Sequence, residues 1–138
     1  MNVVVLKGSL PRDPERREVA SGSVVLSFDL ATIGPDQRVE AVPIAWADPP
    51  AGASLAAGQV VVVVGRVRRR FFRVGAATQS RTEVVAVEVI PERSRKKAQV
   101  AVDRACVDVA EGFAAAAARP GGKGSRRAPT VSSTGRNR

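Results

Sequence analysis

The residues best suited to chemistry lie in a short basic segment, residues 66–73. It contains five arginines and two phenylalanines in eight positions. Alternation along a strand predicts two faces: Arg66, Arg68, Arg70 and Phe72 on one, and Val67, Arg69, Phe71 and Arg73 on the other. Arginines neutralise phosphates, and an aromatic ring stacks on an unpaired base. The segment therefore predicts contacts with a single-stranded nucleic acid, with Phe72 on a base and Phe71 packed inward.

Three further residues join this candidate interface. Trp46, the only tryptophan, ends a predicted strand that Arg38 begins, and Arg81 precedes the last predicted strand. Two alternatives stay open. A lone tryptophan is often core filler, and the basic segment could be a solvated edge strand whose arginines discourage aggregation while both phenylalanines lie in the core.

Composition excludes several function classes. The 138 residues include 22 Lys and Arg and 13 Asp and Glu, which gives a net charge of +9. This excess of positive charge favours a polyanionic partner. Histidine is absent and Cys106 is the only cysteine, so we expect no His/Cys metal cluster, Ser-His pair or internal disulfide. Carboxylate pairs lack an accompanying base, and we expect neither an enzyme nor a cofactor. Cys106 is interpreted as a small buried hydrophobe.

The apolar runs are too short for a signal peptide or a membrane span, which predicts a cytoplasmic protein. The expected binding of a nucleic acid predicts that it associates with the nucleoid. Residues 1–92 hold 11 basic and 10 acidic side chains, whereas residues 93–138 hold 11 and 3. We therefore expect a folded domain over 1–92, a basic, Ala-rich helix over 93–119 and a disordered basic tail over 120–138. The tail is expected to add phosphate contacts.

The folded part has the periodicity of an all-β domain. Strands are predicted at 3–6, 24–31, 38–46, 60–73 and 82–90, with a turn near Gly75 and a short helix ending at Gly58. Residues 13–17 are predicted to be a loop. Five strands with a helix between the third and fourth are typical of an oligonucleotide/oligosaccharide-binding (OB) barrel. Another small barrel or a sandwich fits the same periodicity.

Residues 94–118 contain an apolar stripe at helical spacing. Val102, Cys106, Val109 and Phe113 are separated by four, three and four positions. The pattern predicts a C-terminal helix whose stripe packs on a neighbour. A partly helical, Ala-rich linker is the alternative.

In order and spacing, these segments resemble the bacterial single-stranded DNA-binding proteins. Residues 8–17 are similar to the family's Gly-x-Leu-x-x-Asp-Pro-Glu-x-Arg segment, and residues 64–72 to its x-Gly-x-Leu-x-x-Arg-x-Trp arm. Residues 28–32, 42–46 and 82–91 are similar to three of its strands. The resemblance implies a barrel that binds single-stranded DNA in replication, recombination or repair, as a homotetramer or homodimer. It also implies stacking roles for Trp46 and Phe72.

The sequence departs from the family at several positions. An aromatic is missing from residues 33–37, and Glu40 stands where another aromatic is usual, so weaker binding or a smaller footprint is expected. The chain ends in Gly135-Arg136-Asn137-Arg138, and recruitment of repair enzymes through an acidic tip is not expected. A replication-restart accessory protein of the same barrel type, and an RNA-binding or structural barrel, are the alternative functions.

Overall fold

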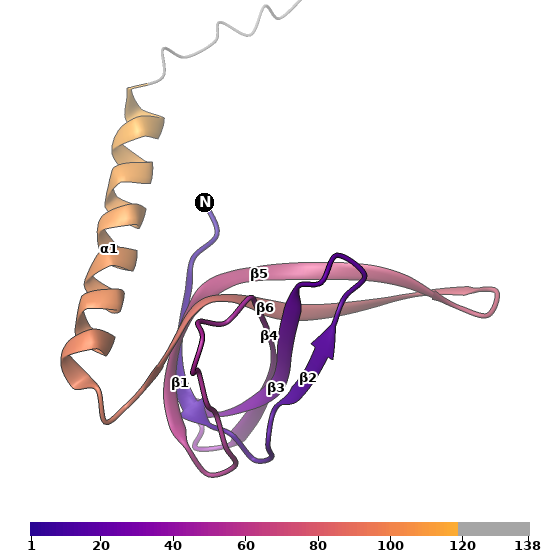
Figure 1. The fold of residues 1–138 in the computed structure, drawn as a ribbon. Helices are drawn as coiled ribbons and strands as arrows, with labels where there is room; N and C mark the ends of the chain where they lie inside the picture. Colours follow the sequence, from indigo (N-terminus) through magenta and orange to yellow (C-terminus); the bar gives the residue numbers. More distant parts are fainter. Residues whose placement is uncertain (119–138) are drawn as a thin grey trace, which may run out of the picture.

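Six strands form one sheet that closes into a ring, and a single helix follows it in residues 1–118, the part of the chain that this computed structural model describes (Figure 1). The elements are β1 (Val4–Ser9), β2 (Glu15–Glu18), β3 (Val24–Ile33), β4 (Val39–Ala47), β5 (Val60–Val74), β6 (Ala77–Pro91) and α1 (Arg95–Ala117). The mostly-β fold and the C-terminal helix are confirmed. The predicted tail, 120–138, lies outside the described residues.

The ring runs in the order β1-β5-β6-β4-β3 and closes where Ser9 of β1 pairs with Ala31 of β3. All neighbours are antiparallel except β4 and β6, which are parallel over Ile44–Trp46. A hydrogen bond from Lys7 of β1 lowers the pKa of Glu92, which directly follows β6. Lys7 thus links β1 to the residue that follows β6.

The core lies inside the ring, and every second residue of the long strands points into it. The buried side chains are Leu10, Leu26, Phe28, Leu30, Ile44, Trp46, Val61, Val63, Val84, Ala86 and Val89. A register shift at Val64/Gly65 changes the pairing of β5 with β6. Val64 itself lies on the outer side, under α1. Val61, Val63 and Val64 are buried, whereas Val60 and Val62 are half-buried.

The loop predicted at residues 13–17 is wrong, because Glu15–Glu18 form β2. This strand pairs with Val24–Ser27 of β3 through a turn that contains Gly22, whose φ is 83°. All four of its side chains are exposed. A strand that is polar on both faces has no hydrophobic alternation, and that is why the sequence pattern missed it.

The short helix predicted to end at Gly58 is absent, and turns occupy its place. The amide of Ala57 donates to the Asp13 carboxylate at 2.8 Å, and the amide of Gly58 donates to the Leu10 carbonyl at 2.7 Å. These donors are therefore satisfied by the chain around Leu10 rather than by a helical turn. Four residues are also too few to offset the cost of helix nucleation.

Helix α1 packs through alanines rather than through the predicted apolar stripe. Ala98, Ala101 and Ala105 are buried, the last two against Val64. Small side chains let the helix approach the sheet closely, whereas Cys106 and Phe113 are exposed. The prediction that Cys106 is buried is wrong. No helix within residues 1–118 is both long and apolar enough to cross a membrane.

Ring closure predicts that Gly8 tolerates no side chain. A Cβ at this position would overlap the Ala31 carbonyl oxygen, so Gly8→Ala must push β1 away from β3. We expect a loss of about 1–3 kcal/mol in the free energy of unfolding, measured by urea denaturation.

Gly34→Ala is the matched control. Its Cβ would meet only the side-chain oxygens of Asp36 and Glu40, at 3.1 Å, and these can rotate away. Equal stability of the two variants would contradict this account of ring closure.

Candidate nucleic-acid interface

The most prominent feature outside the ring is a hairpin arm, residues 66–83, built from the second half of β5 and the first half of β6. The two strands pair without interruption from Arg66↔Val85 to Val74↔Ala77, and Gly75, with φ at 61°, makes the turn. Figure 1 shows the arm reaching away from the ring on the side opposite to α1. The predicted strand, turn and alternation of this segment are confirmed.

The base of the arm is fixed by Asn2. Its side-chain amide donates to the Val67 carbonyl at 2.6 Å and accepts from the Val67 amide at 2.9 Å. The Asn2 side chain thus continues the ladder between β1 and β5 beyond its last pair, Val4↔Gly65. On the other edge, β4 pairs with β6 no further than Val84. Beyond these points the arm is a two-stranded ribbon with both edges unpaired. Its arginines protect such edges against strand-to-strand aggregation.

The outer face of the arm carries Arg68, Arg70 and Phe72, which lie opposite Glu83, Arg81 and Gln79. It continues the outer surface of the ring, because Val64 and Arg66 have the same strand parity. Glu83 is only 7% exposed and lies 2.6 Å from Arg68 Nη2 and 3.5 Å from Arg70 Nη1. One buried carboxylate thus holds two guanidinium groups along this face. Within residues 1–118, the buried Nε of Arg68 has no hydrogen-bond partner.

The inner face of the arm carries Arg69, Phe71 and Arg73, opposite Thr82, Ser80 and Thr78. Phe71 is 68% exposed and Phe72 is 40% exposed, so the prediction that Phe71 packs inward is wrong. The strand parity was right, since Val63 on the same face of β5 is fully buried. The arm, however, has left the ring by residue 71, and no core remains beneath that face.

A cleft of about 300 Å³ joins the base of the arm to β2 and β3. Its basic lining residues are Arg12, Arg17, Arg70 and Arg81, and its acidic ones are Asp13, Glu15, Asp29 and Glu83. Asp29 pairs with Arg12 at 3.2 Å. Sequence reasoning missed Arg12, Arg17 and Glu83 as interface residues. The sequence pattern predicts Arg17 to lie in a loop and predicts no role for Arg12, whereas the structure places Arg17 on β2 and both residues in the cleft beside the arm.

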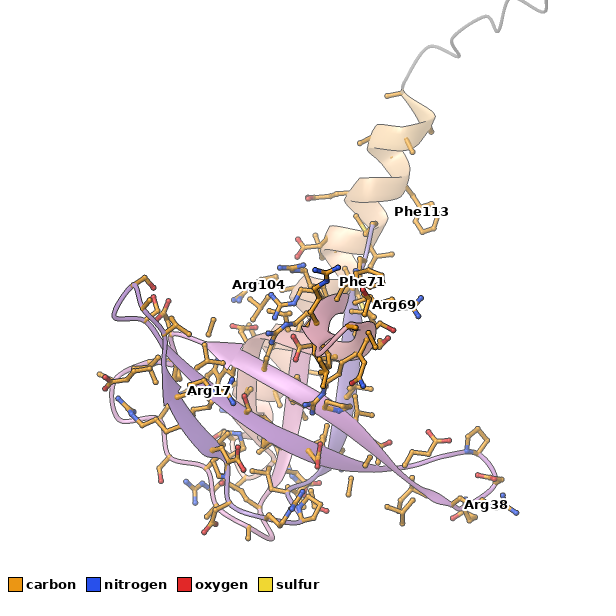
Figure 2. All side chains as sticks on the ribbon, turned by 90° about the vertical axis from the view of Figure 1, so that its right-hand side faces the viewer. Arg17, Arg38, Arg69, Phe71, Arg104 and Phe113 are labelled. Carbon is orange, nitrogen blue, oxygen red and sulfur yellow. The ribbon has the colours of Figure 1, made fainter. Side chains whose placement is uncertain are left out.

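Two predicted site residues lie elsewhere. Arg38 precedes β4 in the β3–β4 hairpin, where it pairs with Asp36 at 3.3 Å, and Figure 2 shows it well apart from Arg69 and Phe71. Trp46 is 5% exposed within the core, opposite Leu26. The structure thus brings neither residue to the arm, and we leave both out of the interface. The parity that Trp46 shares with Ile44, also a core residue, is the signal for its burial.

The remaining arginines of the arm are exposed and lack an acidic partner. Within residues 1–118, no ion pair is formed by Arg66, Arg69, Arg73 or Arg81. Arg66 lines a groove between the ring and α1, beside Arg104. The arm and cleft together present closely spaced guanidinium groups beside exposed aromatic rings, an arrangement suited to phosphates and unpaired bases.

No protein-family model and no curated protein sequence matches this chain. In the described part of the chain, no group of three or more His, Cys, Asp or Glu residues could hold a metal ion.

The paired arginines predict the effect of Glu83→Gln. The carboxylate of Glu83 competes with phosphates for Arg68 and Arg70. Its neutralisation should tighten binding of a dT oligonucleotide and steepen the slope of log K against log salt by about 0.7 for each additional phosphate that the two arginines neutralise. Fluorescence anisotropy titrations across a salt series measure both quantities.

Glu88→Gln is the control, because Glu88 pairs with Arg104 of α1, away from the cleft. Unchanged affinity and slope in folded Glu83→Gln protein would show that Glu83 does not compete with phosphate.

Proposed function

We propose that this chain binds single-stranded DNA without sequence preference, through the outer face of the arm and the adjoining cleft. The observation that carries the proposal is the arm itself, on which exposed arginines flank an exposed phenylalanine beside a cleft whose lining includes four arginines and four carboxylates. Guanidinium groups bind the phosphates, and the Phe72 ring stacks on a base. Stacking accepts every base, so sequence preference is expected to be small.

We propose in addition that the ring is an OB-fold. Its order, β1-β5-β6-β4-β3, with parallel β4 and β6, fits a five-strand barrel in which β2 extends the first strand. OB-folds bind oligonucleotides on the face of their second and third strands, between the loop that follows the first strand and the loop that precedes the fifth. In this chain these correspond to β3 and β4, the β2–β3 turn and the arm. Ser27 and Asp29 of β3 line the cleft, which supports this assignment.

The same proposal includes membership of the bacterial single-stranded DNA-binding family, on the resemblance of residues 8–17 and 64–72. It also includes assembly into a homodimer or homotetramer, and action on nucleoid DNA during replication, recombination or repair. Binding of RNA is an outcome that the experiments below distinguish, because stacking and phosphate contacts serve both nucleic acids while only RNA carries the 2′-hydroxyl.

The first test compares nucleic acids of equal length. At moderate salt the chain should bind a dT oligonucleotide more tightly than a DNA duplex, because only unpaired bases can stack on Phe72. Its affinity should also fall steeply with salt as phosphate contacts are lost. Anisotropy titrations of dT, rU and duplex probes measure this. Equal affinity for dT and duplex would contradict the proposal, and a clear preference for rU would assign the chain to RNA.

The second test removes the stacking ring. Phe72→Ala should weaken binding of the dT oligonucleotide by about 1–3 kcal/mol while the thermal unfolding midpoint stays unchanged, because the side chain lies outside the core. Phe113→Ala is the matched control, since Phe113 is an exposed phenylalanine on α1 (Figure 2). If both variants bind as tightly as the wild-type chain, Phe72 does not stack on DNA.

A further inference from the structure

The inner face of the arm is an exposed surface that the proposed DNA path does not use. Along β5 this face begins with Val63 in the core and continues through Val67 to Arg69, Phe71 and Arg73. Exposure rises along the same series, from a fully buried Val63 to a Phe71 that is 68% exposed. Beyond the ring, the arm thus has two solvent-facing sides, and each one carries a phenylalanine and arginines.

The charge on the inner face is not neutralised. The residues opposite Arg69, Phe71 and Arg73 are Thr82, Ser80 and Thr78, which are neutral and carry hydroxyl donors. Neither arginine forms an ion pair within residues 1–118. The outer face differs, because Glu83 occupies both Arg68 and Arg70. The inner face is therefore at least as ready to accept a phosphate as the outer one.

The inner face also holds a preformed aromatic platform. The Arg69 guanidinium lies 5.5 Å from the centroid of the Phe71 ring, and its Nη2 donates to Ser80 Oγ at 3.1 Å. This hydrogen bond orients the cation over one side of the ring, which limits the entropy lost on binding. The ring is mostly exposed, so a base can stack on it while Arg69 and Arg73 contact the flanking phosphates. Figure 2 shows Arg69 and Phe71 together on the arm, which points toward the viewer.

From these observations we propose that the inner face binds a second segment of single-stranded nucleic acid, so that one chain bridges two strands. This inference rests on the proposed function, which places the first segment on the outer face. Side chains of neighbouring residues point to opposite sides of the ribbon, so the two segments are separated by the arm itself. Two short oligonucleotides can occupy the faces at once, and a longer strand can pass around an unpaired edge of the ribbon.

The test uses two short dT oligonucleotides, one with a donor dye and one with an acceptor dye, which cannot pair with each other. With the full chain we expect two oligonucleotides bound per chain and energy transfer between the dyes. The triple variant Arg69→Ser, Phe71→Ala, Arg73→Ser should still bind one oligonucleotide per chain but lose the energy transfer. All three positions are exposed, so the variant is expected to fold.

The matched variant on the outer face is Arg70→Ser, Phe72→Ala, Arg81→Ser, which likewise removes two arginines and one phenylalanine. It should also lose energy transfer, and its remaining oligonucleotide should sit on the inner face. Combining all six substitutions should abolish binding. Light scattering of each protein, with and without oligonucleotide, measures its oligomeric state in parallel.

Three results would overturn the bridging proposal while leaving the proposed function intact. The first is binding of one oligonucleotide per wild-type chain without energy transfer. The second is energy transfer that persists in the inner-face variant, which would assign bridging to association between chains. The third is a change in the mass of the DNA-free protein caused by the inner-face substitutions, which would make this face a protein contact. Failure of the wild-type chain to bind any oligonucleotide would instead refute both proposals.

Discussion

The pairing of β5 with β6 is the constraint on which both the core and the candidate interface depend. At one end of this ladder Val61, Val63 and Val89 fill the ring, and at the other end the same two strands form the arm. The register shift at Val64/Gly65 lies between the two parts. Because the ladder continues past this shift into the arm, the orientation of each arginine is set by the register of strands that the core holds in place.

Ion pairing differs between the two faces of the arm. Glu83, buried where the arm leaves the ring, holds Arg68 and Arg70 in fixed positions. A buried carboxylate needs such partners, because an unpaired charge in that position would be costly. On the opposite, inner face of the arm, Arg69 and Arg73 form no ion pair with a carboxylate of residues 1–118. The outer face is thus preorganised where the arm begins, whereas the inner face keeps its charge available for a polyanion.

Much of the fold could be predicted from the sequence, because the long strands and the arm show clear alternation. The features that were missed share a physical cause, the lack of a one-sided hydrophobic pattern. β2 is polar on both faces, and α1 packs through alanines that a search for large apolar residues passes over. The site was predicted less well. The faces of Phe71 and Trp46 follow from parity, but their exposure depends on where the ring ends, which only the tertiary structure defines.

The most direct test of the central claim is a map of the amide chemical-shift changes in the ¹⁵N-labelled chain when a dT oligonucleotide is added. The account predicts that the largest changes occur in residues 66–83 and in the cleft residues 12–17. Changes in α1 and around Arg38 should be small by comparison. Shifts concentrated on α1, or a spectrum that does not change at saturating oligonucleotide, would contradict the assignment of the arm as the nucleic-acid interface.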